Sequence, residues 1–289
     1  MIDYPRQSWF PLLFATKGTV LPRVAVRMLL LTVIAAGLTA LAHEGIFKID
    51  VAPLAHSLIG VALGLLLVFR TNASYDRYWE GRKQWGAIVN ASRNLVRAAA
   101  AYTRAPGRVA ELATVYPLAV KQHLRGDKSL EELRVHLPGR EALVETLVAA
   151  PNPPVMLALQ LTAWIEEQVR TQGLSPELAR AMESYVAALL DAQGACERIL
   201  RTPMPFAYVV HIRQLLILYL LSLPFVLVGP LGWSAPVAVA FIAFGLLGIE
   251  EIGVEIEDPF GTDPNDLPIE AICATIARDA QMLVGRPTR

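Results

Sequence analysis

Two long stretches without charged side chains constrain this chain more than any other feature. Residues 51–69 and 214–249 contain no Asp, Glu, Lys or Arg. A helix that crosses a bilayer needs roughly 20 mostly apolar residues, and the second stretch is far longer than that. A Gly-Pro-Leu-Gly sequence at 229–232 interrupts it, and Gly and Pro mark turns. We therefore predict three membrane helices, over residues 51–69, 214–228 and 233–249.

A fourth apolar segment, from Met28 to Ala42, precedes these three. It is short for a span, but Arg27 can reach the interface with its head group and so lengthen the helix. Arg213 can do the same at the start of the third helix. The chain is thus expected to cross the membrane four times.

The flanking loops predict the orientation of these four helices. Basic residues lie before the first helix, after the second and before the third. The opposite loops, 43–50 and 229–236, contain a single basic residue, Lys48. Loops rich in Lys and Arg stay on the cytoplasmic side. We expect a multi-pass membrane protein with both termini in the cytoplasm.

The rest of the chain also has a helical pattern, with breaks at Pro106, Pro138 and residues 151–154. No β-strand alternation is evident, so the predicted fold class is an all-α membrane protein with a large cytoplasmic helical region. The expected organisation is an N-terminal segment with two membrane helices over 1–72, the cytoplasmic region over 73–205, two further membrane helices over 206–250, and a C-terminal cytoplasmic segment with an acidic loop over 251–289.

Composition and motifs narrow the classes of function. Of 289 residues, 54% are hydrophobic, and 26 basic side chains balance 26 acidic ones. Nucleic-acid binding requires a basic surplus, so nucleic acid is excluded as a main partner. Phosphate-binding glycine loops, a nucleophile elbow and a zinc-protease motif are all absent from the sequence. The two cysteines, Cys196 and Cys273, have no metal-site spacing and are expected to be buried and free.

The second membrane helix carries an apolar stripe. At helical spacing, one face collects six side chains, while Gly60 and Gly64 form a ridge of small residues beside it. The stripe suits lipid, a partner helix, or the axis of a ring of identical helices, where it would form a hydrophobic constriction. His56 lies away from this face and is expected to serve packing or subunit contact. The stripe consists of Leu54, Leu58, Val61, Ala62, Leu65 and Phe69.

Two further segments are chemically distinctive. The first, FRTNASYDRYWEGRKQW at 69–85, has the arginines and aromatic rings of a membrane interface, with Arg70, Tyr75 and Trp79 as anchors. The second, EEIGVEIEDPFGTDPND at 250–266, places acids at a helix C-terminus, where they oppose the helix dipole. Arginines from the junctions of the second or third helix would compensate them; a hard cation bound by loop oxygens is the alternative.

Together these two segments resemble the bestrophin family in its bacterial branch. The matching pieces are residues 69–86, the apolar helix before them, and EEIGVEIEDPFGTDPNDLPIE at 250–270, with Pro259, Phe260 and Gly261 at its centre. The resemblance implies a homopentameric ion channel of a bacterial inner membrane, with one central pore lined by the second membrane helix of each subunit. It also implies that the partners are further copies of the chain, membrane lipids and permeant ions.

The resemblance places the three rings of the pore neck at Leu54, Leu58 and Ala62. Ala62 departs from the bulky side chains usual at its position, so Leu54 and Leu58 would form the main barrier. The resemblance also implies a second, cytoplasmic aperture near Leu174, Glu177 and Leu178. Five inward Glu177 carboxylates would favour cations there.

Animal bestrophins bind calcium in the acidic run after Pro-Phe-Gly. By position, Asp263 and Asp266 correspond to side-chain ligands and Asp258 to a backbone ligand. Here Pro264 and Asn265 interrupt the run, so no cofactor is required, and Ca²⁺ or another divalent cation at the loop is one alternative. The other is structural: the loop ties the chain to residues 9–14 of a neighbouring subunit.

We therefore expect a passive channel for small monovalent ions and not an enzyme. The family is labelled for chloride, whereas the acids near the cytoplasmic mouth favour monovalent cations in this member. One alternative is a metal-dependent membrane hydrolase or transferase that uses the acids at 258–266. The other is a membrane scaffold without a pore.

Overall fold

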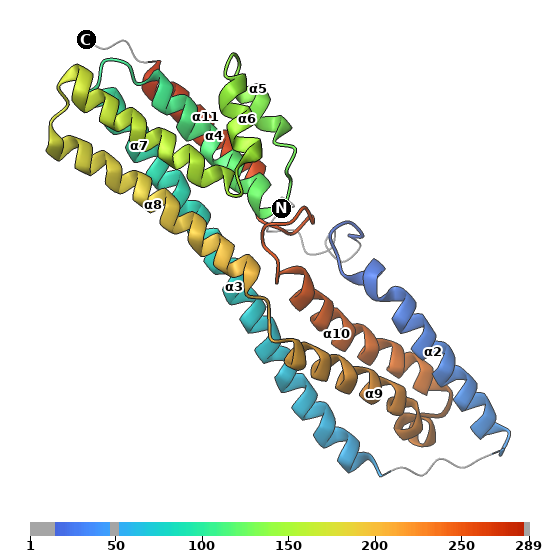
Figure 1. Ribbon diagram of the computed structural model, residues 1–289. Coiled ribbons are helices and arrows are strands. Elements are labelled where there is room, and N and C mark those ends of the chain that lie inside the picture. The colour runs from blue at the N-terminus through green and yellow to red at the C-terminus, as the bar shows by residue number, and fades with distance from the viewer. Residues whose placement is uncertain (1–14, 47–51, 286–289) are drawn as a thin grey trace. The chain divides into compact units, whose positions relative to one another are not determined.

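The computed structural model describes residues 15–46 and 52–285, and within them all regular structure is helical (Figure 1). The all-α prediction is confirmed for these residues. In chain order the elements are α2 (Leu21–His43), α3 (Pro53–Tyr102), α4 (Gly107–Leu124), α5 (Glu131–His136), α6 (Glu141–Ala149), α7 (Pro153–Gln172), α8 (Pro176–Arg201), α9 (Phe206–Leu231), the 3₁₀ turn η1 (Gly232–Ser234), α10 (Ala235–Glu255) and α11 (Ile269–Val284).

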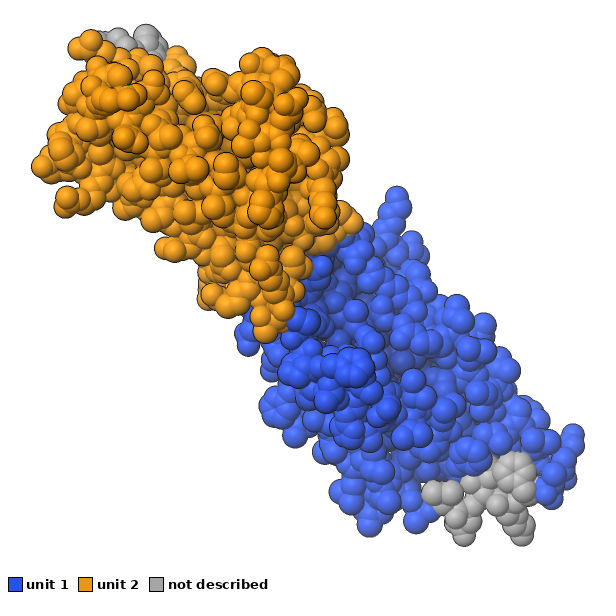
Figure 2. Space-filling view, in the orientation of Figure 1, with its two compact units in different colours: residues 1–78, 203–258, 263–266 blue, residues 79–202, 259–262, 267–289 orange. Residues whose placement is uncertain are grey.

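The chain divides into two compact units (Figure 2). Unit 1 comprises residues 1–78, 203–258 and 263–266, and unit 2 comprises residues 79–202, 259–262 and 267–289. Helix α3 runs without a break through residue 78, so one helix contributes to both units.

Unit 1 contains α2, the first half of α3, α9 and α10. All four helices contribute to one apolar core, which takes Val24 and Leu31 from α2 and Leu63 and Leu67 from α3. The Tyr208 hydroxyl of α9 donates to the Leu66 carbonyl of α3 over 3.2 Å. Three helical stretches are long and apolar enough to cross a membrane: Leu21–His43, Pro53–Tyr102, and Phe206–Glu255, which spans α9, η1 and α10.

The helices are longer than the apolar segments that predicted them. Helix α3 continues 33 residues beyond the end of the uncharged run at residue 69. Composition locates only the apolar part of a helix. The helix itself ends where a capping residue, Gly or Pro interrupts the backbone hydrogen bonds.

The turn between α9 and α10 lies slightly later than predicted. Pro224 and Pro230 are both inside α9, which ends at Leu231. Proline is tolerated in apolar helices whose neighbours satisfy the freed backbone groups. The break comes at Gly232, whose φ of +51° suits glycine and stops the helix.

Unit 2 is built around α4, which packs against α7 and α11. The predicted proline breaks are confirmed: Pro106 precedes α4, Pro138 lies between α5 and α6, and α7 begins at Pro153. Asn152 caps α7, because its side chain accepts a hydrogen bond from the Val155 amide over 3.4 Å.

Candidate functional site

The first half of α3 presents one apolar face that nothing else in unit 1 covers. Leu54 is 72% exposed and Leu58 64% exposed, and Ala62 is also exposed. On the opposite side of the helix, Leu63 and Leu67 are buried in the core of unit 1. The helix therefore packs by one side and leaves the other free, and all three predicted neck residues lie on the free side. The remaining members of the predicted stripe, Val61, Leu65 and Phe69, are exposed as well.

The packed side of α3 meets α9 through a histidine and a glycine. The His56 ring stacks on Tyr219 with a centroid separation of 4.1 Å, and its Nε2 lies 3.1 Å from Ser222 Oγ. A Cβ added at Gly60 would lie 2.7 Å from Tyr219 Oη, whereas one at Gly64 would meet nothing within 4 Å. His56 thus has the expected packing role, and only Gly60 of the predicted ridge makes a close approach within the chain.

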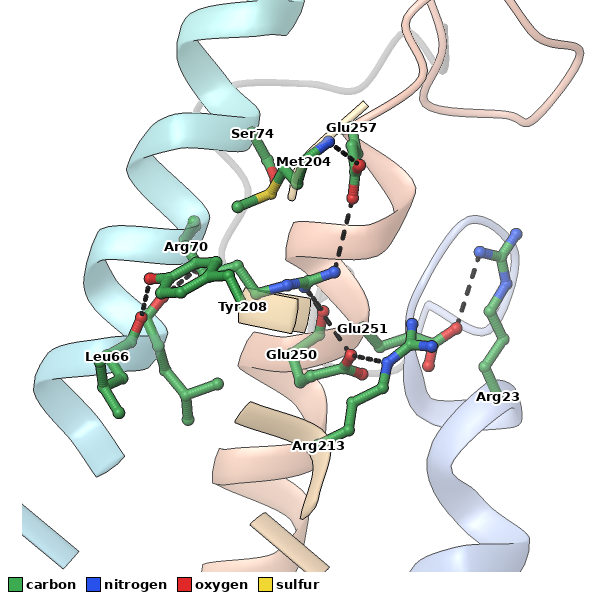
Figure 3. Close-up of polar contacts among 12 residues, drawn as sticks. Arg23, Leu66, Arg70, Ser74, Met204, Tyr208, Arg213, Glu250, Glu251 and Glu257 are labelled. Atoms are coloured by element: carbon green, nitrogen blue, oxygen red, sulfur yellow. Dashed lines mark hydrogen bonds and ion pairs between the residues drawn. The ribbon is translucent and has the colours of Figure 1, made fainter. Parts of the chain in front are cut away.

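Directly after Phe69, the last residue of the apolar stripe, Arg70 is buried between two acids (Figure 3). Its Nη1 donates to the Glu250 carbonyl over 2.8 Å and lies 3.8 Å from Glu250 Oε1. Its Nη2 lies 3.6 Å from Glu257 Oε2. A buried charge requires such partners. Arg70 is therefore a structural residue inside unit 1. Because α3 continues to Tyr102, Arg70 lies within the helix and not at its C-terminus.

Glu250 is compensated from a second side by α9. Arg213 Nε donates to Glu250 Oε1 over 3.0 Å (Figure 3). The sequence predicted that arginines from the second and third helix junctions would balance the acids at the end of α10. Arg70 and Arg213 are those two residues.

Two more arginines come from α2, where the sequence suggested a different role. Arg27 Nη2 lies 2.6 Å from Glu251 Oε2. Arg23 Nη2 lies 3.8 Å from Glu255 Oε1 and 3.2 Å from Asp263 Oδ2. The interface position expected for the Arg27 head group stays a prediction; within unit 1 its guanidinium pairs with Glu251 of α10. Arg27 and Glu251 are 224 positions apart in the sequence, so residue spacing could not predict this contact.

The acidic loop after α10 is held by hydrogen bonds within unit 1. Asp266 is almost fully buried, and its carboxylate accepts a hydrogen bond from the Asp263 amide over 2.7 Å. Burial raises the pKa of Asp266 to about 6. Asn265 donates to Glu255 Oε1 over 3.0 Å and to the Gly18 carbonyl over 2.9 Å. Asn265, which interrupts the acidic run, thus fastens the loop to α10 and to the chain before α2.

The contacts of Asp263 and Asp266 bear on the metal site predicted at Asp258, Asp263 and Asp266. Within residues 15–46 and 52–285, no three His, Cys, Asp or Glu side chains form a group able to hold a metal ion. Asp263 is paired with Arg23, and the Asp266 carboxylate accepts a hydrogen bond from the Asp263 amide, so both side chains have protein partners. The predicted contact with residues 9–14 lies outside the described residues.

The Pro-Phe-Gly segment is a packing element of unit 2. Phe260 is buried, and a Cβ at Gly81 would lie 3.0 Å from both Phe260 Cε1 and Pro259 Cγ. Arg125 donates to the Phe260 carbonyl over 3.0 Å and to the Gly261 carbonyl over 2.7 Å. The sequence pointed to Pro259, Phe260 and Gly261 but not to Arg125, which follows α4 without any local motif.

The remaining predicted residues lie on other parts of the surface. Tyr75 and Trp79 are both about half exposed, as side chains that face a membrane interface would be. At the start of α8, Glu177 is exposed and Leu178 is half-buried, whereas Leu174 is buried within unit 2. Of the three proposed aperture residues, Glu177 is the one most open to solvent.

Comparison with known proteins decides the family. The profile of a family described as Bacterial/Fungal Bestrophin protein matches residues 1–282. This chain belongs to the bestrophin family. The resemblance carried by the segments at 69–86 and 250–270 is therefore confirmed.

Relatives of this bestrophin carry a common name. A voltage-dependent anion channel-forming protein of Synechocystis is 38% identical over 288 residues, which cover 96% of this chain and 92% of the relative. A protein of the same name from Nostoc is 40% identical, with 97% and 93% covered. Family and names indicate a channel and not an enzyme.

Solved structures of a bestrophin homologue agree in fold. A bacterial bestrophin homologue from Klebsiella pneumoniae is 30% identical and superposes with a TM-score of 0.82, covering 93% of this chain and all of its own. A point variant of that homologue, also 30% identical, gives a TM-score of 0.84 over 91% of this chain and all of its own. The long α3 with its free apolar face thus belongs to a bestrophin fold.

Proposed function

We propose that this bestrophin is a passive channel for small monovalent ions, with a pore along the free face of α3 from several copies of the chain. The observation that carries the proposal is the row of exposed apolar side chains at Leu54, Leu58 and Ala62. Such a row suits lipid or the axis of a pore, and the relatives named as channel-forming proteins favour the axis of a pore. Five copies around an axis, as the family resemblance implies, would turn the row into stacked apolar rings.

The chemistry of these rings defines how the neck would act. Leu54, Leu58 and Ala62 offer neither charge nor hydrogen-bonding groups, so an ion that passes must shed part of its water. A narrow apolar constriction closes by dewetting and opens when it widens enough to hold water. We propose that Leu54 and Leu58 form the barrier and that the Ala62 ring is wider. Ions with weak hydration should then pass more readily than ions with strong hydration of the same charge.

The sign of the permeant ion is set outside this neck. The sequence favoured cations because of the acids between Glu250 and Asp266. Glu250, Glu251 and Glu255 are each paired with arginine in unit 1, so they supply little free negative charge. The curated relatives are named for anions. We therefore propose anions as permeant ions and retain monovalent cations as the second candidate, through an exposed Glu177 at the aperture.

The wider architecture of the proposal follows the sequence expectations. The channel would have four spans per subunit, formed by α2, the first half of α3, α9 and α10. Both termini would lie on the cytoplasmic side of a bacterial inner membrane. No bound metal is needed, because Asp263 and Asp266 are already engaged with protein groups.

Ion flux through purified protein tests the proposal. Chains reconstituted into planar bilayers should conduct, and Leu54→Ala with Leu58→Ala should raise the conductance or keep the pore open, because the barrier loses bulk. Leu29→Ala with Leu30→Ala removes two similarly exposed apolar side chains from α2 and should leave conductance unchanged. A correctly assembled protein that carries no current, or equal currents from both double variants, would contradict the proposal.

A further inference from the structure

The free face of α3 does not end with the apolar rings. Because an α-helix has 3.6 residues per turn, about eighteen residues make five whole turns. Asn72 stands eighteen residues after Leu54, and Asp76 stands eighteen residues after Leu58. Both side chains are exposed and belong to unit 1. The face that carries the proposed neck therefore continues, within the same unit, as an amide and then a carboxylate.

Asp76 differs from the acids near the end of α10. No hydrogen bond or ion pair from the residues that the structure describes reaches its carboxylate. The neighbouring Arg77 is directed elsewhere, since its Nε donates to the Glu257 carbonyl over 3.1 Å. Glu250 and Glu251, by contrast, are neutralised by arginine partners. On the face that leads away from the neck, Asp76 thus lacks, among the described residues, the arginine partners that Glu250 and Glu251 have.

Glu80 follows Ala62 by the same eighteen residues but is not equivalent. Its side chain is half-buried and accepts a hydrogen bond from Gln84 Nε2 over 2.7 Å. The next exposed charges along α3, Arg82 and Lys83, lie six and seven residues beyond Asp76, which is about 9 Å or more at the helical rise. That distance exceeds the Debye length of about 8 Å at physiological salt, so both offset the Asp76 charge only weakly.

We infer that Asp76 is a determinant of charge selectivity in the channel proposed above. Its carboxylate, one from each subunit, forms the first charged ring on the neck face. It lowers the permeability to anions relative to cations at that mouth of the pore. The inference rests on the proposed function, because it needs the free face of α3 to line the pore.

The test measures the reversal potential of the full-length protein in planar bilayers under a potassium chloride gradient. Asp76→Asn keeps the size of the side chain and removes its charge, and Asp76→Glu keeps the charge. At low salt, Asp76→Asn should raise the anion-to-cation permeability ratio about 25-fold, because one unit charge about 4 Å away in water changes the anion and the cation about fivefold each, in opposite directions. The effect should shrink in molar salt.

Controls separate this inference from the pore itself. Asp76→Glu should resemble the unmodified protein, and Glu145→Gln, which removes an exposed charge from α6, should not change the ratio. If the Asp76→Asn channel conducts with an unchanged anion-to-cation permeability ratio, the role of Asp76 is overturned. The neck assignment is still supported in that case, provided that Leu58→Ala changes the conductance. A protein with no current, or with a conductance indifferent to Leu58→Ala, overturns the proposed function and this inference with it.

Discussion

At Arg70 a guanidinium is held almost completely away from solvent by the carboxylates of Glu250 and Glu257. Taking a charge out of water costs several kcal/mol, and the two carboxylates, at 3.8 and 3.6 Å, offset part of that cost, although Arg70 Nε and Nη2 make no hydrogen bond with the described residues. The space around it is also restricted, since a Cβ at Gly253 would lie 2.7 Å from Arg70 Nη1. Arg70 therefore joins α3 to α10 through charge and through shape.

Removal of this charge should destabilise unit 1 strongly. Arg70→Gln leaves Glu250 and Glu257 short of a partner and should lower the free energy of unfolding by roughly 3–5 kcal/mol. Arg27→Gln, which breaks a pair whose arginine is about half exposed, should cost about 1 kcal/mol or less. Thermal unfolding in detergent compares the two. Equal losses of melting temperature would show that burial of the Arg70 pair is not what stabilises the fold.

Asp266 allows a test of pH dependence. Because burial raises its pKa to about 6, the folded state favours the protonated carboxyl. Its stabilising contribution is complete below the ordinary value near 4 and is lost as pH rises through about 6. Asp266→Asn should therefore be neutral or stabilising at about pH 7.5 and should flatten the pH dependence of the melting temperature between about pH 4 and 7.

The same variant tests the metal question. Asn can still accept the hydrogen bond from the Asp263 amide, so the loop should keep its form. If Asp266 were a calcium ligand, the variant would instead be clearly destabilised at neutral pH, and added calcium would raise the melting temperature of the unmodified protein only. We expect calcium to have no effect on either protein.

At the scale of the element, the contact between α3 and α9 depends on one glycine. Tyr219 lies over Gly60 and stacks on His56, so its ring has little freedom to move away. Gly60→Ala should cost about 1–3 kcal/mol through overpacking. The added Cβ of Gly64→Ala meets no described residue within 4 Å, so this variant should gain about 0.5–1 kcal/mol from helix propensity. A melting temperature that falls equally in both variants would contradict this arrangement.

The sequence predicted the apolar part of each helix better than the residues at which the helix begins and ends. Uncharged runs located the three stretches of the described residues that are long and apolar enough to cross a membrane, because hydropathy depends directly on residue type. The sequence did not predict that α3 continues as one helix to Tyr102. The apolar run ends at residue 69, so hydropathy gives no sign of the helix beyond it, although no Gly or Pro near residue 70 would end a helix. Prolines located the breaks in unit 2 well, yet Pro117 lies inside α4, where packing overrides local preference.

At the scale of the whole molecule, the sequence located the candidate site better than its partners. Helical spacing alone placed Leu54, Leu58 and Ala62 on one face, because a helix has a fixed period. The pairing of Arg23 and Arg27 with α10 was missed, since contacts between distant segments leave no trace in spacing. The free charge of Asp76 was missed for the same reason: it becomes evident only once the other acids are seen to be paired.

The central claim is that the free face of α3 lines an ion pore, and thiol modification tests it most directly. The native Cys196 and Cys273 are buried and their pKa values are raised to about 12, so both should react slowly. In planar bilayers, a charged thiol reagent should change the current through Leu58→Cys channels within minutes and leave Leu29→Cys channels unchanged. Equal responses at both positions, or none at Leu58→Cys in a conducting protein, would contradict the account.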